Sequence, residues 1–280
     1  MAPIPNPVPP KTTQLLVSFP SPHVLLLTFN RPERLNAMSP QLAKDLESVL
    51  DWFEGEGELW VVIVTGNGRA FCAGMDLIAW NESKKTNSAL EVSRLSPQHG
   101  FGSLSRRQSR KPIIAAVNGI GAYGGGTEIV LNCDIVVASD TAKFALPEVK
   151  RGVFAGAGGI PRVSRIAGHQ LASEMLLTGR NVTAKEAFDR FGFVNAVVPP
   201  SSLIPTAISY AEQIVANSPD SIQVTKVGLL LALKHDPENA FDLSVSSAEN
   251  ARMHSGENIK EGLAAFAEKR KPAWKNPAKL

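Results

Sequence analysis

The stretch from Lys111 to Arg151 constrains the fold of this chain more than any other part of the sequence. An apolar run from Pro112 to Val117 leads into a glycine-rich loop at 118–126, and a second apolar run follows from Asp134 to Ala138. Only about two helical turns fit between the loop and the second run. The spacing therefore predicts two neighbouring strands of one sheet joined by a short helix, which is an α/β arrangement.

Apolar periodicity extends this α/β pattern on both sides of the stretch. Two short β-type runs, Thr13–Phe19 and His23–Phe29, are separated by a proline-containing turn and predict a hairpin. Ser39-Pro40 predicts a helix start, because a serine N-cap is often followed by proline. Thr183-Ala-Lys-Glu186 is a capping-box pattern, which predicts a helix reaching Phe191. Helices alone are expected beyond Pro199, over Leu203–Asn217, Ser221–Lys234, Pro237–Arg252 and Ile259–Lys271.

Composition divides the chain into four segments. Residues 1–10 are a proline-rich tail without charged side chains, residues 11–198 form the predicted α/β core, and residues 199–277 form the helical region. The tail has the pattern of neither a transit peptide nor a signal peptide. The last three residues, 278–280, are Ala-Lys-Leu, which is similar to the Ser-Lys-Leu address of peroxisomal proteins.

Charge and residue usage disfavour several classes of function. The net charge is only +3 over 280 residues, and the basic clusters near Arg106 and Lys269 are not interleaved with aromatic residues, so nucleic-acid binding is disfavoured. No apolar run is long enough to span a membrane. Cys72 and Cys133 are not spaced as metal ligands, and their number indicates a reducing compartment. The sequence contains no HExxH or GxSxG motif, so neither a metal site nor a serine nucleophile is predicted.

The glycine loop allows two interpretations. Gly119, Gly121 and Gly124 match GxGxxG after a predicted strand, which is typical of a dinucleotide-binding turn. That interpretation is disfavoured because the following helix is too short and Asp140 comes only 16 residues after Gly124. The alternative is that the loop presents unpaired backbone N–H groups, which stabilise developing negative charge. The turn at Ala73-Gly74-Met75 also leads toward a predicted helix and offers a second donor; for one such turn alone, tight packing would explain the glycines.

Two glutamates, Glu128 and Glu148, lie 20 residues apart in mostly apolar surroundings. Burying a carboxylate costs free energy unless the group is paired or used in chemistry. Glu148 could instead pair with Lys150 or Arg151 at the surface, and Glu128 could be a solvated helix residue. If both face one poorly solvated pocket, the pKa of one carboxyl group rises, so that one is protonated while the other is ionised. The pair would then supply an acid and a base.

Seven motifs together resemble the enoyl-CoA hydratase/isomerase (crotonase) superfamily. They follow the family's order and spacing from about Leu26 to Lys271. They are Phe71-Cys-Ala-Gly-Met-Asp-Leu77, Ala115-Ala-Val-Asn-Gly119 with Gly-Gly-Gly-Thr-Glu128, Cys133-Asp134, Pro147-Glu148, Gly156-Ala-Gly-Gly159, Leu177-Thr-Gly179 and Phe266-Ala-Glu-Lys-Arg-Lys271. The resemblance implies a ClpP-like spiral of β-β-α repeats with a helical C-terminal trimerisation region, assembled as a homotrimer or a dimer of trimers.

The resemblance also implies a substrate and a site. The substrate is an acyl-CoA, and no metal or redox cofactor takes part. The backbone N–H groups of Met75 and Gly125 form an oxyanion hole for the thioester oxygen. Glu128 orients a water molecule that adds to C3, while Glu148 delivers a proton to C2. The residues expected to contact the substrate are Arg34, Leu35, Ala73, Asp76, Leu77, Phe266 and Lys269.

The expected activity is hydration of a trans-2-enoyl-CoA, in β-oxidation or a related acyl-CoA pathway. Isomerases of the superfamily commonly retain only the carboxylate at the position of Glu148, so the presence of both favours a hydratase. A Δ3,Δ2-enoyl-CoA isomerase or another crotonase-type lyase is the alternative, and a non-catalytic binding protein is a third hypothesis. Phe154-Ala155 and Pro161 differ from mitochondrial short-chain hydratases, so the acyl chain stays open. The Ala-Lys-Leu ending predicts binding to the peroxisomal import receptor and a peroxisomal location.

Overall fold

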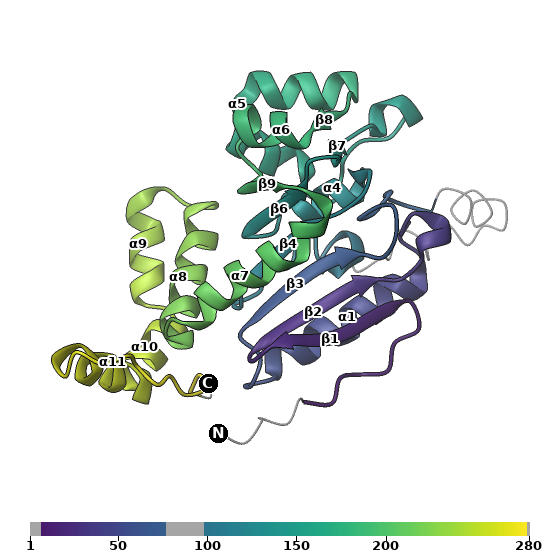
Figure 1. The fold of residues 1–280 in the computed structure, drawn as a ribbon. Coiled ribbons are helices and arrows are strands. Elements are labelled where there is room, and N and C mark those ends of the chain that lie inside the picture. The colour runs from purple at the N-terminus through teal and green to yellow at the C-terminus, as the bar shows by residue number, and fades with distance from the viewer. Residues whose placement is uncertain (1–6, 77–97, 279–280) are drawn as a thin grey trace.

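A six-stranded sheet lies at the centre of the computed structural model, which describes residues 7–76 and 98–278 (Figure 1). Strands β1 (Leu15–Ser21) and β2 (Val24–Phe29) pair antiparallel, which confirms the predicted hairpin. The other strands add in parallel, in the order β1-β2-β3-β4-β6-β9. They are β3 (Val61–Gly66), β4 (Ile113–Val117), β6 (Ile135–Ser139) and β9 (Ala196–Val198). The two strands predicted around the glycine loop, β4 and β6, are indeed neighbours.

The sequence pattern does not predict a second sheet of three short strands. This sheet has the order β5-β7-β8, over Gly121–Tyr123, Lys143–Ala145 and Val182–Thr183. Strands of two or three residues are too short to show a period. In β5, Gly121 has a φ of +104°, and a Cβ there would lie 1.9 Å from the carbonyl oxygen of Lys143. The loop therefore needs a glycine at this position for β5 to pair with β7.

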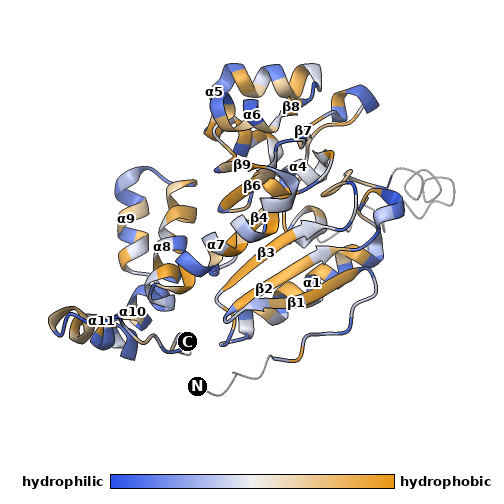
Figure 2. Cartoon of the chain, viewed as in Figure 1, coloured by the Kyte–Doolittle hydropathy of each residue, from blue (hydrophilic) through white to orange (hydrophobic). Residues whose placement is uncertain are grey.

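Helices cover both faces of the large sheet. Helix α1 (Pro40–Gly55) begins after Ser39, whose hydroxyl accepts from the N–H of Leu42, as this N-cap predicts. Its apolar face, with Leu46 and Phe53, packs into the main core. Helix α7 (Leu203–Val215) covers the other face through Ala207 and its neighbours. The strands between these helices are mostly hydrophobic (Figure 2), as a sheet buried on both faces requires.

Shorter helices carry the chain between these layers. Helix α4 (Gly125–Val130) follows the glycine loop and precedes β6, with about the length that the spacing predicted. Helix α5 (Gly159–Thr178) begins in the second glycine-rich segment and is interrupted at Gly168. The predicted capping box is present at the start of α6 (Ala184–Glu186), which continues into the π-helical turn η4 (Ala187–Phe191). The described residues also form four 3₁₀ turns, namely η1 (Pro32–Arg34), η2 (Phe101–Ser103), η3 (Glu148–Arg151) and η5 (Pro200–Ser202).

Four more helices follow α7, namely α8 (Pro219–Ala232), α9 (Pro237–Val245), α10 (Ala248–Ser255) and α11 (Glu257–Ala267). The prediction of one helix over Pro237–Arg252 is wrong, because Ser247 starts a new helix by accepting from the N–H of Asn250. Lys226 of α8 forms an ion pair with Asp134 beside β6, which ties these helices to the core. Within residues 7–76 and 98–278, no helix is long and apolar enough to cross a membrane.

Candidate active site

Glu128 lies in the first turn of α4, directly behind the three consecutive glycines. The residue is only 3% exposed, and its Oε1 accepts from the backbone N–H groups of Ala157 (2.8 Å) and Gly159 (2.9 Å). Burial raises the pKa of this carboxyl group, while the two hydrogen bonds and the positive charge of Arg162 lower it. The alternative that Glu128 is a solvated helix residue is therefore wrong.

Glu148 is the first residue of η3 and is partly buried. Its Oε2 is shielded from solvent and has no hydrogen-bond partner in the described part of the chain. Burial raises the pKa of the Glu148 carboxyl group to about 7, and the charge of Glu128 also raises it. Lys150 and Arg151, the two partners considered for a surface pair, are both exposed. The surroundings of Glu148 thus favour a protonated carboxyl group near neutral pH.

Gly124 contacts the backbone of Glu128 and lies beside the carboxyl group of Glu148. Its carbonyl oxygen accepts from the N–H of Glu128 at 3.1 Å, and a Cβ on Gly124 would lie 3.2 Å from Oε1 of Glu148. Gly124 has a φ of +54° and a ψ of −127°, a conformation that side chains disfavour. The negative charge of Glu128 adds to the effect of burial in raising the pKa of Glu148, so a proton on Glu148 is favoured while Glu128 is ionised.

Two backbone N–H groups belong to the same region. Gly125 is the first residue of α4, so its N–H has no acceptor within the helix. Met75 forms a parallel bridge with Met38, in which Met38 donates to Gly74 (2.8 Å) and Asp76 donates to Met38 (3.3 Å). In a bridge of this pattern, the N–H of the central residue points away from the partner strand. The N–H of Met75 is thus directed away from Met38.

A pocket of about 300 Å³ is lined by Glu148, Met75 and Gly125, whereas Glu128 lies behind Gly125 and is not part of its lining. Its lining consists of Ala73, Gly74, Met75, Tyr123, Gly124, Gly125, Pro147, Glu148, Arg151 and Val153. Three larger cavities among the described residues, of about 490, 470 and 390 Å³, contain none of the four residues predicted to be catalytic or to form the oxyanion hole. Among the described residues, no group of three or more His, Cys, Asp or Glu side chains is placed to hold a metal ion.

The residues predicted to contact the substrate near the start of the chain lie beside this pocket. Ala73 lines it and donates its N–H to the carbonyl oxygen of Leu35 at 3.0 Å, so the exposed Arg34 lies next to the same edge. Asp76 is held by an ion pair with Arg31, with 3.2 Å between Oδ2 and Nη2. Leu77 lies outside the described residues.

Phe266 and Lys269, the two predicted contacts near the end of the chain, lie far from the pocket. Phe266 belongs to α11 and is 86% exposed, and Lys269 follows this helix. Figure 1 shows α11 at the opposite end of the molecule from α4. Within one chain, the structure therefore does not bring these two residues together with the glutamate pair.

Several groups that build the site escape sequence reasoning. The N–H donors of Ala157 and Gly159 are backbone atoms, which leave no signature in residue type, and their only signal is the second glycine-rich segment. Tyr123, Arg151 and Val153 line the pocket, but nothing in their spacing distinguishes them. β5 carries Tyr123 and η3 carries Arg151, and both residues reach the pocket only because the fold brings these two elements together.

The end of α5 packs against the segment that carries Glu148. Gly179 terminates this helix with a φ of +59°. A Cβ on Gly179 would lie 3.1 Å from Cε of Lys150 and 3.2 Å from Cα of Pro147, the residue before Glu148. This close approach requires a glycine, and it makes the position of Glu148 depend on the junction between α5 and α6.

Comparison with known proteins agrees with this geometry. The Enoyl-CoA hydratase/isomerase family matches residues 21–277. The chain is 44% identical over 271 residues to the mevalonyl-coenzyme A hydratase of Aspergillus fumigatus, covering 97% of this chain and 98% of the relative. It is 42% identical over 275 residues to the mevalonyl-coenzyme A hydratase of Beauveria bassiana, covering 96% and 97%. Among solved structures, the enoyl-CoA hydratase from Bacillus anthracis matches with a TM-score of 0.84 and 34% identity, over 94% of this chain and 99% of that chain.

The fold and the extent of these matches define the class of protein. The chain belongs to the enoyl-CoA hydratase/isomerase family and has the crotonase fold. The relatives named above are hydratases, and the chain is accordingly an enoyl-CoA hydratase, a hydro-lyase that acts on acyl-CoA substrates. The family, the fold class and the enzyme class predicted from the sequence are confirmed.

Proposed function

We propose that the enzyme adds water to a trans-2-enoyl-CoA with Glu128 as the base and Glu148 as the acid. The observation that carries this proposal is that Glu148, on which the charge of the buried Glu128 acts, lines one pocket together with Met75 and Gly125. Ionised Glu128 accepts a proton from water as the water oxygen bonds to C3, and Glu148 gives its proton to C2. The thioester oxygen, which carries the negative charge of the enolate, accepts from the N–H groups of Met75 and Gly125.

The electrostatics of the pair support these two roles. Two backbone donors favour the ionised form of Glu128, whereas the shielded Oε2 of Glu148 has none among the described residues. With its pKa raised to about 7, Glu148 still carries a proton in a large fraction of molecules at neutral pH, as a general acid requires. The proposed reaction uses only these side chains and backbone groups, so it requires no metal or redox cofactor.

For the acyl group, we propose mevalonyl-CoA and the 2-enoyl-CoA that its dehydration yields. Two relatives, at 44% and 42% identity, are named mevalonyl-coenzyme A hydratases. Loss of water from a 3-hydroxyacyl-CoA is hydration in reverse, so the same carboxyl pair serves both directions. Arg151 lines the pocket, and its Nη1 donates to the neighbouring carbonyl oxygen of Lys150 at 3.2 Å. Its guanidinium group is thus able to donate to an oxygen on a polar acyl chain.

A homotrimer, or a dimer of trimers, is the assembly that we propose. Phe266 belongs to α11 and Lys269 follows it, and neither residue lines the pocket of its own chain. In an assembly of several copies, they would be able to contribute only to the pocket of a neighbouring copy. Arg34 and Leu35, which adjoin the Ala73 edge of the pocket, are the proposed contacts for CoA within the chain.

We also propose a peroxisomal location, reached through the import receptor that recognises endings such as Ala-Lys-Leu. The test is a fluorescent protein fused to the N-terminus, so that the ending stays free. Deletion of residues 278–280 should release the fusion into the cytosol. Peroxisomal retention of the deleted form would contradict the proposal.

The activity itself is tested with purified protein and crotonoyl-CoA, by following the loss of the absorbance of the conjugated thioester. Glu128→Gln and Glu148→Gln should each lower kcat by about 10²–10⁴, because each removes one proton-transfer group. Glu238→Gln, at an exposed position in α9, is the matched control and should leave the rate unchanged. Hydration that survives both active-site substitutions would refute the assigned roles, and isomerisation of a 3-enoyl-CoA without hydration would establish the alternative activity.

The acyl preference is tested by comparing crotonoyl-CoA with the 2-enoyl-CoA derived from mevalonyl-CoA. Arg151→Leu should lower kcat/KM for the polar substrate by about tenfold relative to crotonoyl-CoA, because a donor to the acyl oxygen is lost. Lys150→Leu removes the same charge from the neighbouring exposed residue and should not change this ratio. An equal effect of Arg151→Leu on both substrates would show that Arg151 does not read the acyl group.

A further inference from the structure

The turn over residues 157–159 holds Glu128 in place. Both hydrogen bonds to its Oε1 come from this turn, from the N–H groups of Ala157 and Gly159. The fit is tight, since a Cβ on Gly159 would lie 2.9 Å from Cγ of Glu128. The position and the charge of the base therefore depend on whatever fixes this turn.

Arg162, in the first turn of α5, fixes the turn from behind. Its Nη1 donates to the carbonyl oxygen of Gly158 at 3.0 Å, and its Nε donates to Oδ1 of Asn132 at 2.9 Å. The Nδ2 of Asn132 donates in turn to the carbonyl oxygens of Leu104 (2.7 Å) and Arg107 (3.0 Å). The guanidinium group thus connects the turn to the residue just beyond α4, the helix that carries Glu128.

The backbone of the turn is shaped to admit this guanidinium group. Gly158 has a φ of +110°, and a Cβ there would lie 2.1 Å from Nη1 of Arg162. Only a glycine leaves this space free. A second, uncharged contact holds the same turn, because the hydroxyl of Ser105 donates to the carbonyl oxygen of Ala157 at 2.8 Å. Ser105 and Arg162 therefore both support the turn, but only Arg162 brings a charge.

That charge acts on Glu128. Glu128 interacts with the positive charge of Arg162 from α5, and its own charge acts on Glu148 from η3. Arg106, after η2, adds positive charge near Arg162. Burial disfavours the ionised form of Glu128, and Arg162 is the cation that opposes this effect. Without it, the base would compete less well with Glu148 for the ionised state.

We propose that Arg162 is a positioning residue for catalysis, which orients the 157–159 turn and keeps Glu128 ionised so that it acts as the base. This inference rests on the proposed hydration mechanism. Arg162 touches neither the substrate nor the reacting atoms; it acts through Glu128 alone. Its charge and its hydrogen bonds are separable, so the two contributions are open to independent measurement.

The test compares the pH dependence of kcat/KM with crotonoyl-CoA for the wild type and four variants of the full chain. Arg162→Gln should move the acidic limb toward higher pH by about one unit, because the base loses its nearby positive charge. Arg162→Lys should keep the limb in place and lower kcat, because lysine retains the charge without the forked hydrogen bonds. Arg165→Gln, one turn along α5 at an exposed position, should change neither. Ser105→Ala should lower the rate by the same factor at every pH.

A second measurement separates this inference from the proposed activity. Carboxyl resonances of 13C-labelled glutamate are titrated by NMR, and the signal of Glu128 is identified by its loss in Glu128→Gln. The titration midpoint of Glu128 should rise in Arg162→Gln whether or not hydration is observed. An equal loss of activity at every pH with an unmoved midpoint would overturn the inference. If Arg162→Gln does not fold, Arg162→Lys alone tests the inference. A shift of the acidic limb of its pH–rate profile, or an unchanged kcat, would then overturn the inference.

Discussion

Glu128 and Glu148 are the same chemical group in two different surroundings, and this difference lets one act as a base and the other as an acid. Glu128 accepts two backbone hydrogen bonds near a cation, all of which favour its charge. The shielded Oε2 of Glu148 has no donor among the described residues, and burial raises its pKa to about 7. Two coupled carboxyl groups separate their pKa values in this way, which is what acid–base catalysis with one proton requires.

The raised pKa of Glu148 predicts the upper limb of the pH–rate profile. Below about pH 7 the carboxyl group at 148 holds its proton, and above this pH the group ionises and has no proton to deliver. We expect kcat/KM for hydration to fall about tenfold per pH unit beyond the limb. Dehydration should show the same limb, since the pair carries one proton in either direction. A rate that stays flat up to about pH 9 in both directions would contradict the role of Glu148.

Gly125→Ala tests the oxyanion hole without changing any charge. The new Cβ would lie 2.5 Å from the ring of Phe101, so the N–H of Gly125 must shift. We expect kcat to fall by about 10²–10³ with a smaller change in KM, because the donor acts mainly on the charge of the transition state. Gly55→Ala is the control, since a Cβ there would meet no atom within 4 Å. A KM effect with an unchanged kcat would assign Gly125 to substrate binding instead.

The catalytic carboxylates are predictable from sequence, whereas the groups that tune them are not. Glu128 and Glu148 stand out because acidic residues seldom lie within apolar runs. The donors at Ala157 and Gly159 belong to the backbone, and the same atoms occur at nearly every position in the chain. What selects them is the path of the turn before α5, which depends on packing between distant segments.

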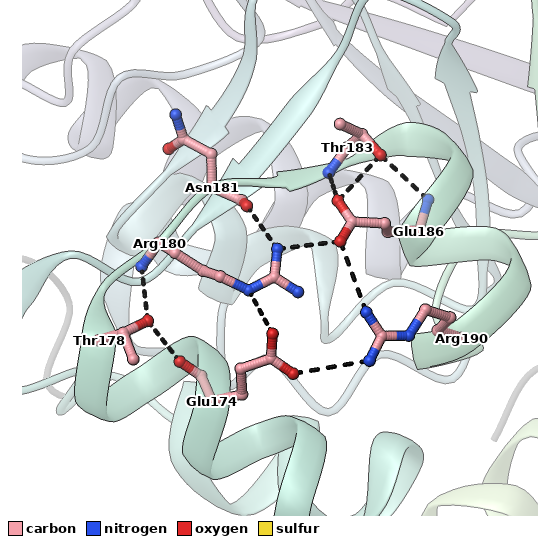
Figure 3. Close-up of polar contacts among 7 residues, drawn as sticks. All are labelled: Glu174, Thr178, Arg180, Asn181, Thr183, Glu186 and Arg190. Carbon is pink, nitrogen blue, oxygen red and sulfur yellow. Dashed lines mark hydrogen bonds and ion pairs between the residues drawn. The ribbon is translucent and has the colours of Figure 1, made fainter.

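At the scale of elements, an ion-pair network supports the wall of the site. Arg180 pairs with Glu174 of α5 at 2.8 Å and with Glu186 of α6 at 2.9 Å, and Arg190 approaches the same two carboxylates at 3.6 and 3.7 Å (Figure 3). The four side chains close a ring across the junction of α5 and α6. Gly179, which packs against the Glu148 segment, is the residue just before this ring.

Arg180→Met should therefore destabilise the fold more than the loss of an ordinary surface ion pair. Arg180 is about one-quarter exposed and serves two carboxylates, so we expect a loss of about 2 kcal/mol in the free energy of unfolding. Thermal melting should fall by roughly 4–8 °C. The control is Lys185→Ala, which breaks the exposed pair with Asp189 and should change stability by less than about 0.5 kcal/mol. Equal effects of the two substitutions would show that the network adds nothing beyond separate surface pairs.

The predictability of the elements depends on their length. Helix α1 and the hairpin of β1 and β2 follow from periodicity and capping, because several side chains repeat the same signal. Strands β5 and β7 have three residues each and are specified by close backbone approach, which the sequence shows only as glycines. The break between α9 and α10 depends on one N-cap residue, Ser247. In the sequence, this single residue is a weaker signal than the apolar periodicity that continues across the break.

In the whole molecule, the helices beyond α7 carry several large apolar side chains that are exposed in a single chain. Phe241 of α9 is 63% exposed, and Leu263 and Phe266 of α11 are exposed to a greater extent. Leu229 and Leu233, at the end of α8, are also exposed. Figure 1 shows these helices standing apart from the central sheet. Exposed apolar residues concentrated in one region indicate an interface. In the proposed homotrimer, other copies of the same chain would cover these exposed residues.

Analytical ultracentrifugation of the full chain tests this assembly. The wild type should sediment at about 90 kDa, three times the 30.0 kDa of one chain, or at twice that mass for a dimer of trimers. Phe241→Asp should release monomers, because burying an unpaired carboxylate in an apolar interface costs several kcal/mol. Leu177→Asp provides the matched control, since Leu177 is 75% exposed in α5, outside the helical region, and should leave the trimer intact. A monomeric wild type, or dissociation by Leu177→Asp alone, would place the interface elsewhere and remove the proposed route by which Phe266 and Lys269 contact substrate.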